Sequence, residues 1–166
     1  MSSLAAGFGV VILFLLCSAC DREGRPVQEF GLDKLAPGIS SEGDVRNAMG
    51  QPETTWEDED GTRILEYPEG PEGARTWIFT IGPQGKLTQF HQALTSENFA
   101  RIRPGMSRDA VRRLLGKPRT VVRFDRMHEE VWDYRFLDNQ ERRLFNVHTD
   151  QESGKVTRTS SSEASY

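Results

Sequence analysis

The chain has 166 residues, a net charge of −4 at pH 7 and two cysteines, Cys17 and Cys20. Both cysteines lie close to the amino terminus, and a chain that begins at Cys20 keeps only one of them. The sequence therefore excludes an internal disulfide framework, on which many small secreted domains depend.

The amino terminus has the pattern of a secretory signal. The first 19 residues carry no charged side chain, and residues 4–17 form an apolar run of 14. A helix needs about 20 apolar residues to cross a bilayer core, so we predict that residues 1–19 are a signal peptide. The small residues Ser18 and Ala19 followed by Cys20 resemble the bacterial lipobox, which implies lipidation of Cys20. A plain signal peptide, or an anchor extended through Cys20, is the alternative.

The two ends of the remaining chain are polar. Residues 20–28 are predicted to be a lipidated amino terminus and a linker that holds the domain away from the membrane surface. Two or three acyl chains would anchor the protein stably, because each buried methylene contributes about 0.8 kcal/mol. Residues 160–166 contain four serines and no apolar pattern, and we predict a disordered tail.

Between these ends the sequence contains the same helix frame twice, as PGISSEGDVRNAMGQP at 37–52 and PGMSRDAVRRLLGKP at 104–118. Each frame has a serine that can cap a helix, an acidic residue in the first turn and a closing glycine followed by proline. A shorter helical piece precedes each frame, at 29–35 and at 96–102. Helices of about three turns are not stable alone in water, so each is expected to cover a sheet.

Three strands are expected after each frame, because segments rich in β-branched and aromatic residues alternate with turn residues. They are residues 63–67, 75–81 and 85–94 in the first unit, and 130–136, 142–148 and 154–159 in the second. We therefore predict an α+β fold of two tandem units, 29–94 and 95–159, each with the order helix, helix, strand, strand, strand. The period is about 67 residues. Each antiparallel sheet is expected to be covered by helices.

Aromatic residues alternate along one strand of each unit and are predicted to form the core beneath the helices. The two stripes are Trp77, Phe79 and Ile81 in the first unit and Trp132, Tyr134 and Phe136 in the second. The alternative is that one stripe lines an open sheet face and binds a partner. The opposite set of Thr76, Ile78 and Thr80 is less apolar, which favours the core interpretation.

Charge is distributed unevenly along the chain. Residues 21–73 carry 14 acidic and 5 basic side chains, whereas residues 74–126 carry 3 acidic and 11 basic ones. Arginine suits phosphate or carboxylate because its planar group donates two hydrogen bonds at once, and a basic residue near an anionic membrane contributes about 1 kcal/mol of attraction. The candidate surface for a partner or anionic lipid comprises Arg108, Arg112, Arg113, Lys117 and Arg119. The alternative is a solvated helix face balanced partly by the acidic first unit.

Catalytic patterns are weak, and we expect neither an enzyme nor a metal or cofactor site. His91, His128 and His148 lack metal-ligand spacing, and the sequence contains no phosphate loop, nucleophile elbow or dinucleotide fingerprint. The acidic run at 57–60 could attract a divalent cation, but it lacks the spacing of a calcium loop and predicts a turn. Nucleic acid is not an expected partner, because the signal directs the chain away from the cytoplasm.

The second frame, with a Trp-Asp-Tyr strand at 132–134 and a Gly-Lys-Val strand at 154–156, resembles the SmpA/OmlA (BamE-like) family of bacterial lipoproteins. The first unit is the more divergent copy, with Ile39 where the family usually has methionine. A tandem departs from the single unit of the BamE-like proteins. Two such units in tandem are also the architecture of the β-lactamase inhibitory proteins.

This resemblance implies a lipid-anchored scaffold in outer-membrane β-barrel assembly, with assembly subunits or anionic lipid as partners. The alternative is a tandem periplasmic binding or inhibitor module that captures a protein or ligand on a concave sheet. The resemblance favours the outer membrane as location. Asp21, directly after Cys20, is similar to an inner-membrane retention signal of enteric bacteria and keeps that membrane as the alternative.

Overall fold

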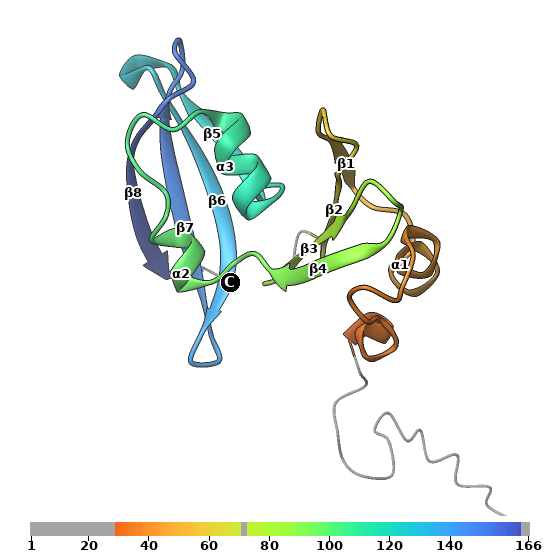
Figure 1. Ribbon diagram of the computed structural model, residues 1–166. Coiled ribbons are helices and arrows are strands. Elements are labelled where there is room, and N and C mark those ends of the chain that lie inside the picture. The colour runs from red at the N-terminus through yellow and green to blue at the C-terminus, as the bar shows by residue number, and fades with distance from the viewer. Residues whose placement is uncertain (1–28, 71–72, 164–166) are drawn as a thin grey trace, which may run out of the picture.

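The structure, a computed structural model, describes residues 29–70 and 73–163 (Figure 1). The predicted signal peptide, Cys20 and the linker lie outside the described residues. Two four-stranded antiparallel sheets have the orders β1-β2-β3-β4 and β5-β6-β7-β8. The predicted α+β class with two helix-bearing antiparallel sheets is confirmed. The two sheets are separate in the part of the chain that is described, since no strand of one pairs with a strand of the other.

The first unit contains a 3-10 helix, an α-helix and four strands. They are η1 (Glu29–Lys34), α1 (Glu42–Met49), β1 (Thr54–Glu57), β2 (Arg63–Pro68), β3 (Thr76–Ile81) and β4 (Leu87–Gln92). Helix α1 begins where the sequence predicts, because Ser41 and Asp44 form a capping box: the Asp44 N–H donates to Ser41 Oγ at 3.2 Å, and the Ser41 N–H donates to Asp44 Oδ2 at 2.8 Å. Gly50 ends the helix at φ 85°.

The second unit repeats this plan with longer strands. Its elements are α2 (Ser96–Phe99), α3 (Arg108–Leu115), β5 (Thr120–Phe124), η2 (Asp125–Met127), β6 (Glu129–Asp138), β7 (Glu141–Asp150) and β8 (Val156–Glu163). The Ser107 hydroxyl accepts from the Ala110 N–H at 3.2 Å and caps α3, and Gly116 closes it at φ 80°. Both helices of the repeated frame therefore form at the predicted positions.

The two units repeat specific contacts as well as elements. The Tyr67 hydroxyl donates to the carbonyl of Gly50 at 3.1 Å, and the Tyr134 hydroxyl donates to that of Gly116 at 3.2 Å. Each bond ties the end of a frame helix to the second strand of its own sheet. Complete burial raises the pKa of Tyr134, so this hydroxyl stays protonated and keeps donating.

Each sheet has one strand more than the sequence analysis expects. Strands β1 and β5 begin two residues after the closing proline of each frame and pair antiparallel with β2 and β6. Strand β8 also continues to Glu163, so residues 160–163 belong to a strand and not to the predicted disordered tail. The long partner β7 provides the reason, because Arg143 still pairs with Glu163 and Asn146 donates to Ser160 and Ser162 at 3.3 Å.

Each unit has its own hydrophobic core between its frame helix and its sheet. In the first, Val45 of α1 packs with Leu65, Phe79 and Ile81, all completely buried, and Trp77 lies at the margin. In the second, the buried residues of α3 pack with the stripe of β6; these are Val111, Leu115, Tyr134 and Phe136, with Trp132 at the margin. The core interpretation of both aromatic stripes is confirmed.

Candidate functional site

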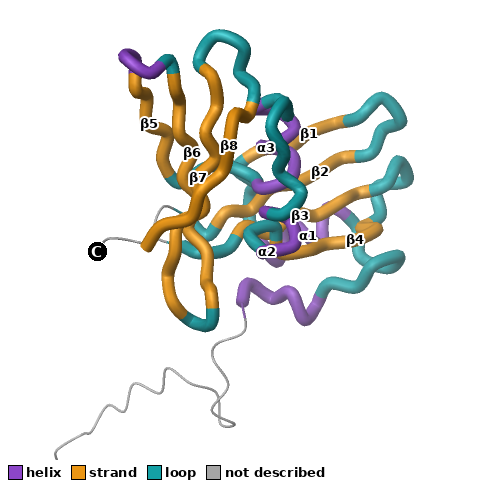
Figure 2. The backbone as a smooth tube through the Cα atoms, turned by 90° about the vertical axis from the view of Figure 1, so that its left-hand side faces the viewer, coloured by secondary structure: helices purple, strands orange, loops and turns teal. Residues whose placement is uncertain are grey.

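Helix α3 lies between the two sheets and makes contacts on two sides, one with each unit (Figures 1 and 2). Its apolar residues Val111 and Leu115 are completely buried in the core of the second unit. Its basic side contacts the face of sheet β1–β4 that points away from α1, since Arg112 and Arg113 reach residues of β1 and β2 and the turn between them. One helix thus joins the two units.

The centre of this contact is the ion pair between Arg112 and Glu66. Glu66 is completely buried, and Arg112 donates to its carboxylate from Nε at 3.3 Å and from an Nη at 3.2 Å. The same guanidinium donates to Thr54 Oγ1 at 3.1 Å, and the backbone N–H of Lys117 donates to Glu66 Oε1 at 2.6 Å. Burial raises the pKa of the Glu66 carboxyl, although the charge of Arg112 and the Lys117 N–H oppose this effect.

The close approach at this point requires the glycine that ends α3. A Cβ on Gly116 would lie 2.6 Å from Thr76 Cγ2 and 3.2 Å from Glu66 Oε1, and its φ of 80° also disfavours any other residue. From the sequence, this glycine is predicted only to close the helix. It also lets the first unit's sheet come into contact with the end of α3.

Two further ion pairs lie at the rim of the same contact. Arg113 donates to Asp58 at 2.6 Å, and its guanidinium carbon lies 5.2 Å from the centre of the Trp56 ring. Lys117 pairs with Glu53. Asp58 belongs to the acidic run at 57–60, whose first residue ends β1 and whose other three lie in the predicted turn between β1 and β2. All three basic groups of this contact therefore meet carboxylates of the first unit.

The other two residues of the candidate basic surface, Arg108 and Arg119, contact residues of their own unit. Arg108 donates from Nε to Glu130 Oε1 at 3.1 Å. Glu130 is 4% exposed and also accepts from Arg123 and from Trp132 Nε1, both at 2.8 Å. Burial alone would raise the pKa of Glu130, but these hydrogen bonds and the two arginine charges lower it. Arg119 donates its backbone N–H to the carbonyl of Asp133 at 2.7 Å.

The geometry brings Arg112, Arg113 and Lys117 together at the contact between the units and separates them from Arg108. A partner or lipid surface made of all five basic residues stays a prediction. Arg113 and Lys117 retain 41% and 50% of their side-chain exposure, so these two can still reach an external phosphate or carboxylate. Lys117 and Arg119 also line a pocket of about 130 Å³ at the junction.

A polar cluster on the outer face of sheet β5–β8 was not predicted. His148, 7% exposed, lies with Nδ1 3.0 Å from Glu129 Oε1 and with Nε2 3.0 Å from Ser160 Oγ. Arg158 donates to the same Glu129 oxygen at 3.1 Å. These bonds connect β6, β7 and β8 and satisfy a buried histidine. The sequence gives little indication of this cluster, because Glu129 and Ser160 are 31 positions apart and Ser160 lies in a run of serines.

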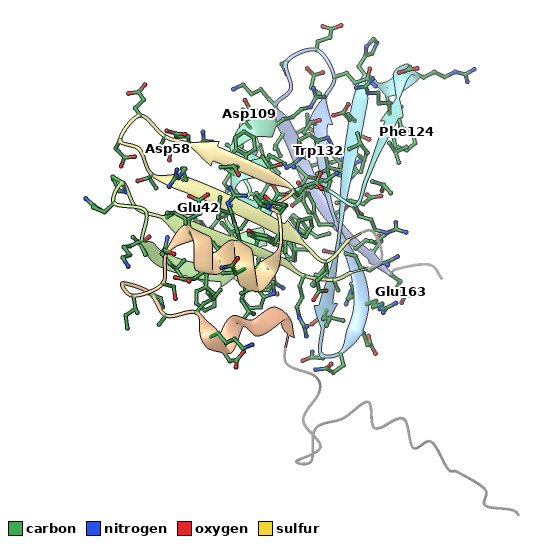
Figure 3. The ribbon with its side chains drawn as sticks, turned by 90° about the vertical axis from the view of Figure 1, so that its right-hand side faces the viewer. Glu42, Asp58, Asp109, Phe124, Trp132 and Glu163 are labelled. Carbon is green, nitrogen blue, oxygen red and sulfur yellow. The ribbon has the colours of Figure 1, made fainter. Side chains whose placement is uncertain are left out.

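An exposed apolar segment at one edge of the same sheet was also missed. Six large hydrophobic side chains are exposed among the described residues, and four of them, Val121, Val122, Phe124 and Met127, belong to β5 and η2. We call these four residues the β5 patch. Figure 3 shows Phe124 on the side of the sheet that faces away from the first unit. The segment was missed because the sequence analysis did not assign a strand there.

Residues 92–157 match the family model described as the outer membrane protein assembly factor BamE domain. The second unit thus resembles the BamE domain. The resemblance predicted from the sequence is confirmed for this part of the chain. The BamE match includes α2, α3 and β5 to β7 and ends at the start of β8, and so covers the helix that joins the two units.

Solved structures that match this chain have low identity and low structural similarity to it. A DUF4309 family protein (YjgB) of Bacillus subtilis is 16% identical over 78% of this chain and 82% of its own, with a TM-score of 0.30. A putative β-lactamase inhibitor protein from Streptococcus mutans is 9% identical over 80% and 93%, also with a TM-score of 0.30. Scores of this size support no inference about function. No curated protein matches the chain significantly. Within residues 29–70 and 73–163, no helix has the length and apolar character needed to cross a membrane.

Proposed function

We propose that this protein is a lipid-anchored scaffold of the bacterial cell envelope that takes part in outer-membrane β-barrel protein assembly. The observation that carries the proposal is the BamE-domain match over residues 92–157. The lipobox-like sequence before Cys20 supports an anchor at the amino terminus, with the folded units in the periplasm. No catalytic step is part of the proposed role.

The contact between the units supports a scaffold in particular. A scaffold has to hold its binding surfaces at a fixed angle, and a buried, fully hydrogen-bonded ion pair tolerates little rotation. Glu66, completely buried, accepts from both Arg112 and the Lys117 backbone. The rim pairs of Arg113 and Lys117 add further restraints on either side. Each unit is thereby positioned by side chains of the other.

The proposed partners are subunits of the assembly machinery, with anionic lipid as an additional contact. Arg113 and Lys117 are the members of the predicted basic surface that we propose for such contacts, because their side chains remain about half exposed. Arg112 is better explained as a joint between the units, since its side chain is only 22% exposed and its guanidinium is occupied by Glu66 and Thr54.

Capture of a ligand on a concave sheet, the alternative role, has less support. The face of the first sheet that such a module would present is occupied by the end of α3. On that face, Thr76 and Ile78 are only 2% and 4% exposed. A stable soluble complex formed through this sheet, and lost when exposed sheet residues are replaced without loss of folding, would favour the alternative.

The test is affinity purification from solubilised membranes of cells that express the tagged full chain. Recovery of β-barrel assembly subunits is expected. The matched control is Cys20→Ala, which is expected to leave the folded units unchanged but to release the protein from the membrane fraction. Recovery of only unrelated proteins by the wild-type chain would exclude the proposed function. Membrane fractionation of the same cells distinguishes outer from inner membrane and so tests the alternative raised by Asp21.

A further inference from the structure

The β5 patch differs from an ordinary protein surface in its concentration of apolar side chains. The exposed fractions are 48% for Val121, 41% for Val122, 40% for Phe124 and 62% for Met127. Exposed hydrophobic residues are common when they are scattered singly, but contiguous ones mark interaction sites. Here they fall within seven consecutive residues, 121–127.

The patch coincides with the open edge of a sheet. Among the described residues, β5 pairs only with β6, so the backbone groups along its other edge are not part of a ladder (Figure 2). Proteins usually protect such edges with charged or polar residues. The opposite edge of the same sheet, β8, follows this rule with the sequence VTRTSSSE, whereas β5 reads TVVRF. An edge strand with exposed apolar residues is suited to accept an additional strand.

Side chains on both faces of β5 are available to such a strand. The register pairs Val122 with Val131 on the outer face of the sheet and Val121 with Trp132 on the face toward α3. Phe124 shares the outer face with Val122, since alternate residues of a strand point to the same side. An added strand would therefore place its own alternate residues beside Val122 and Phe124.

Charge around the edge indicates the chemistry of the occupant. Residues 119–126 contain three arginines, Arg119, Arg123 and Arg126, and one acidic residue, Asp125. Arg123 pairs with Glu130 but leaves 72% of its side chain exposed, and Arg126 is exposed as well. A strand that brings carboxylates would meet this basic edge favourably, whereas a basic strand would be repelled.

We propose that β5 is a docking edge for an extended segment of another protein in which apolar and acidic side chains alternate. The segment adds to the sheet as a strand beside β5, its apolar residues cover Val122 and Phe124, and its carboxylates face the arginines. The proposal rests on the scaffold function proposed above and gives the chemistry of one partner contact.

The direct test uses the full chain in detergent and a synthetic peptide in which glutamate alternates with valine and phenylalanine, with binding followed by fluorescence anisotropy. Saturable binding is expected, and the same peptide with lysine in place of glutamate should bind at least about tenfold more weakly. Peptide N-methylated on alternate residues should also lose binding, because strand addition needs its backbone N–H groups. Equal binding of all three peptides, or no binding of the acidic one, would overturn the proposal.

Variants locate the site. Val122→Lys with Phe124→Lys should weaken binding of the acidic peptide about tenfold or more, whereas the control pair Thr159→Lys with Ser161→Lys, on the opposite edge and the helix-facing side of the sheet, should leave it unchanged. These four side chains are exposed, and thermal unfolding checks that all variants fold. If the free chain sediments as a dimer that Val122→Lys with Phe124→Lys dissociates, the edge pairs with a second copy and the proposal is wrong.

Purification from membranes separates this proposal from the proposed function. If the wild-type chain and the Val122→Lys, Phe124→Lys variant recover assembly subunits equally, the docking edge is excluded while the scaffold function stands. If neither recovers them but the peptide binds at β5, the scaffold function fails and the edge chemistry stands.

Discussion

Replacement of Arg112 by alanine should destabilise the fold by an amount that depends on pH. The substitution leaves the Glu66 carboxyl buried with only the Lys117 N–H and no opposite charge. Loss of one partner of a buried ion pair costs about 3–5 kcal/mol. Here the carboxyl can avoid part of that cost by taking up a proton. From its ordinary pKa of 4.5, protonation at pH 7 costs roughly 3.4 kcal/mol, at 1.36 kcal/mol per pH unit.

The cost of protonating Glu66, which sets an upper limit on the penalty for Arg112→Ala, becomes smaller as the pH is lowered. At pH 5 protonation of Glu66 costs only roughly 0.7 kcal/mol by the same relation. The sign follows from linkage: a carboxyl whose pKa is raised on folding binds its proton more tightly in the folded state, so its effect on stability becomes more unfavourable as pH rises above 4.5. The penalty for Arg112→Ala is therefore expected to be about 3 kcal/mol at pH 7 and below about 1 kcal/mol at pH 5.

Urea denaturation of the wild-type chain and the variant at both pH values measures this difference in the free energy of unfolding. The control is Arg113→Ala, whose partner Asp58 keeps 40% of its side-chain exposure, so its effect should stay below about 1 kcal/mol at either pH. A penalty for Arg112→Ala that is equal at pH 5 and pH 7, or larger at pH 5, would contradict the role of Arg112 as the charged partner of a buried Glu66 carboxylate.

Three further outcomes are expected. Gly116→Ala should lower the free energy of unfolding more than Gly50→Ala does. Both glycines have φ near 80°, where backbone strain is about 1–3 kcal/mol, but an added Cβ meets Thr76 only at Gly116. The difference between the two variants in urea denaturation therefore measures the effect of the close approach. The pKa of Glu130 is lowered by its hydrogen bonds and the neighbouring arginine charges despite burial, so its contribution to stability is present above pH 4.5 and lost below it. Glu130→Gln should therefore reduce the loss of unfolding free energy between neutral and acidic pH. An unchanged loss in the variant would contradict this role of Glu130. Cys20→Ala should move the protein from the membrane to the soluble periplasmic fraction, and retention in the membrane would indicate a different anchor.

Local sequence signals predicted the parts of the fold that depend on local interactions. The frame helices start at Ser41 and Ser107 because a hydroxyl within the segment satisfies its first free N–H groups. Strands β1 and β5 are only 4 and 5 residues long and have no extended alternating pattern of their own. They form because β2 and β6 pair with them, which is a property of the tertiary structure.

The site was predictable only in outline. The opposite charge balance of residues 21–73 and 74–126 indicated attraction between the units, and the alternative for the arginines included this possibility. Which arginine meets which carboxylate depends on how α3 lies on the first sheet, and that is fixed by Gly116 and by packing. The β5 patch required knowledge that β5 is an edge strand, which follows from strand order.

The contact between the units is head-to-tail, since a helix of the second unit packs on a sheet face of the first. Such a contact leaves an equivalent sheet face open at the far end. Where the first sheet has Thr54, Glu66 and Ile78 paired across its strands, the second has Thr120, Asp133 and Asn146. Thr120 already donates to Asp133 at 2.7 Å, and Asn146 to Ser160. Where α3 fills the equivalent position on the first sheet, these internal bonds satisfy the polar groups of the second sheet without a helix from another unit.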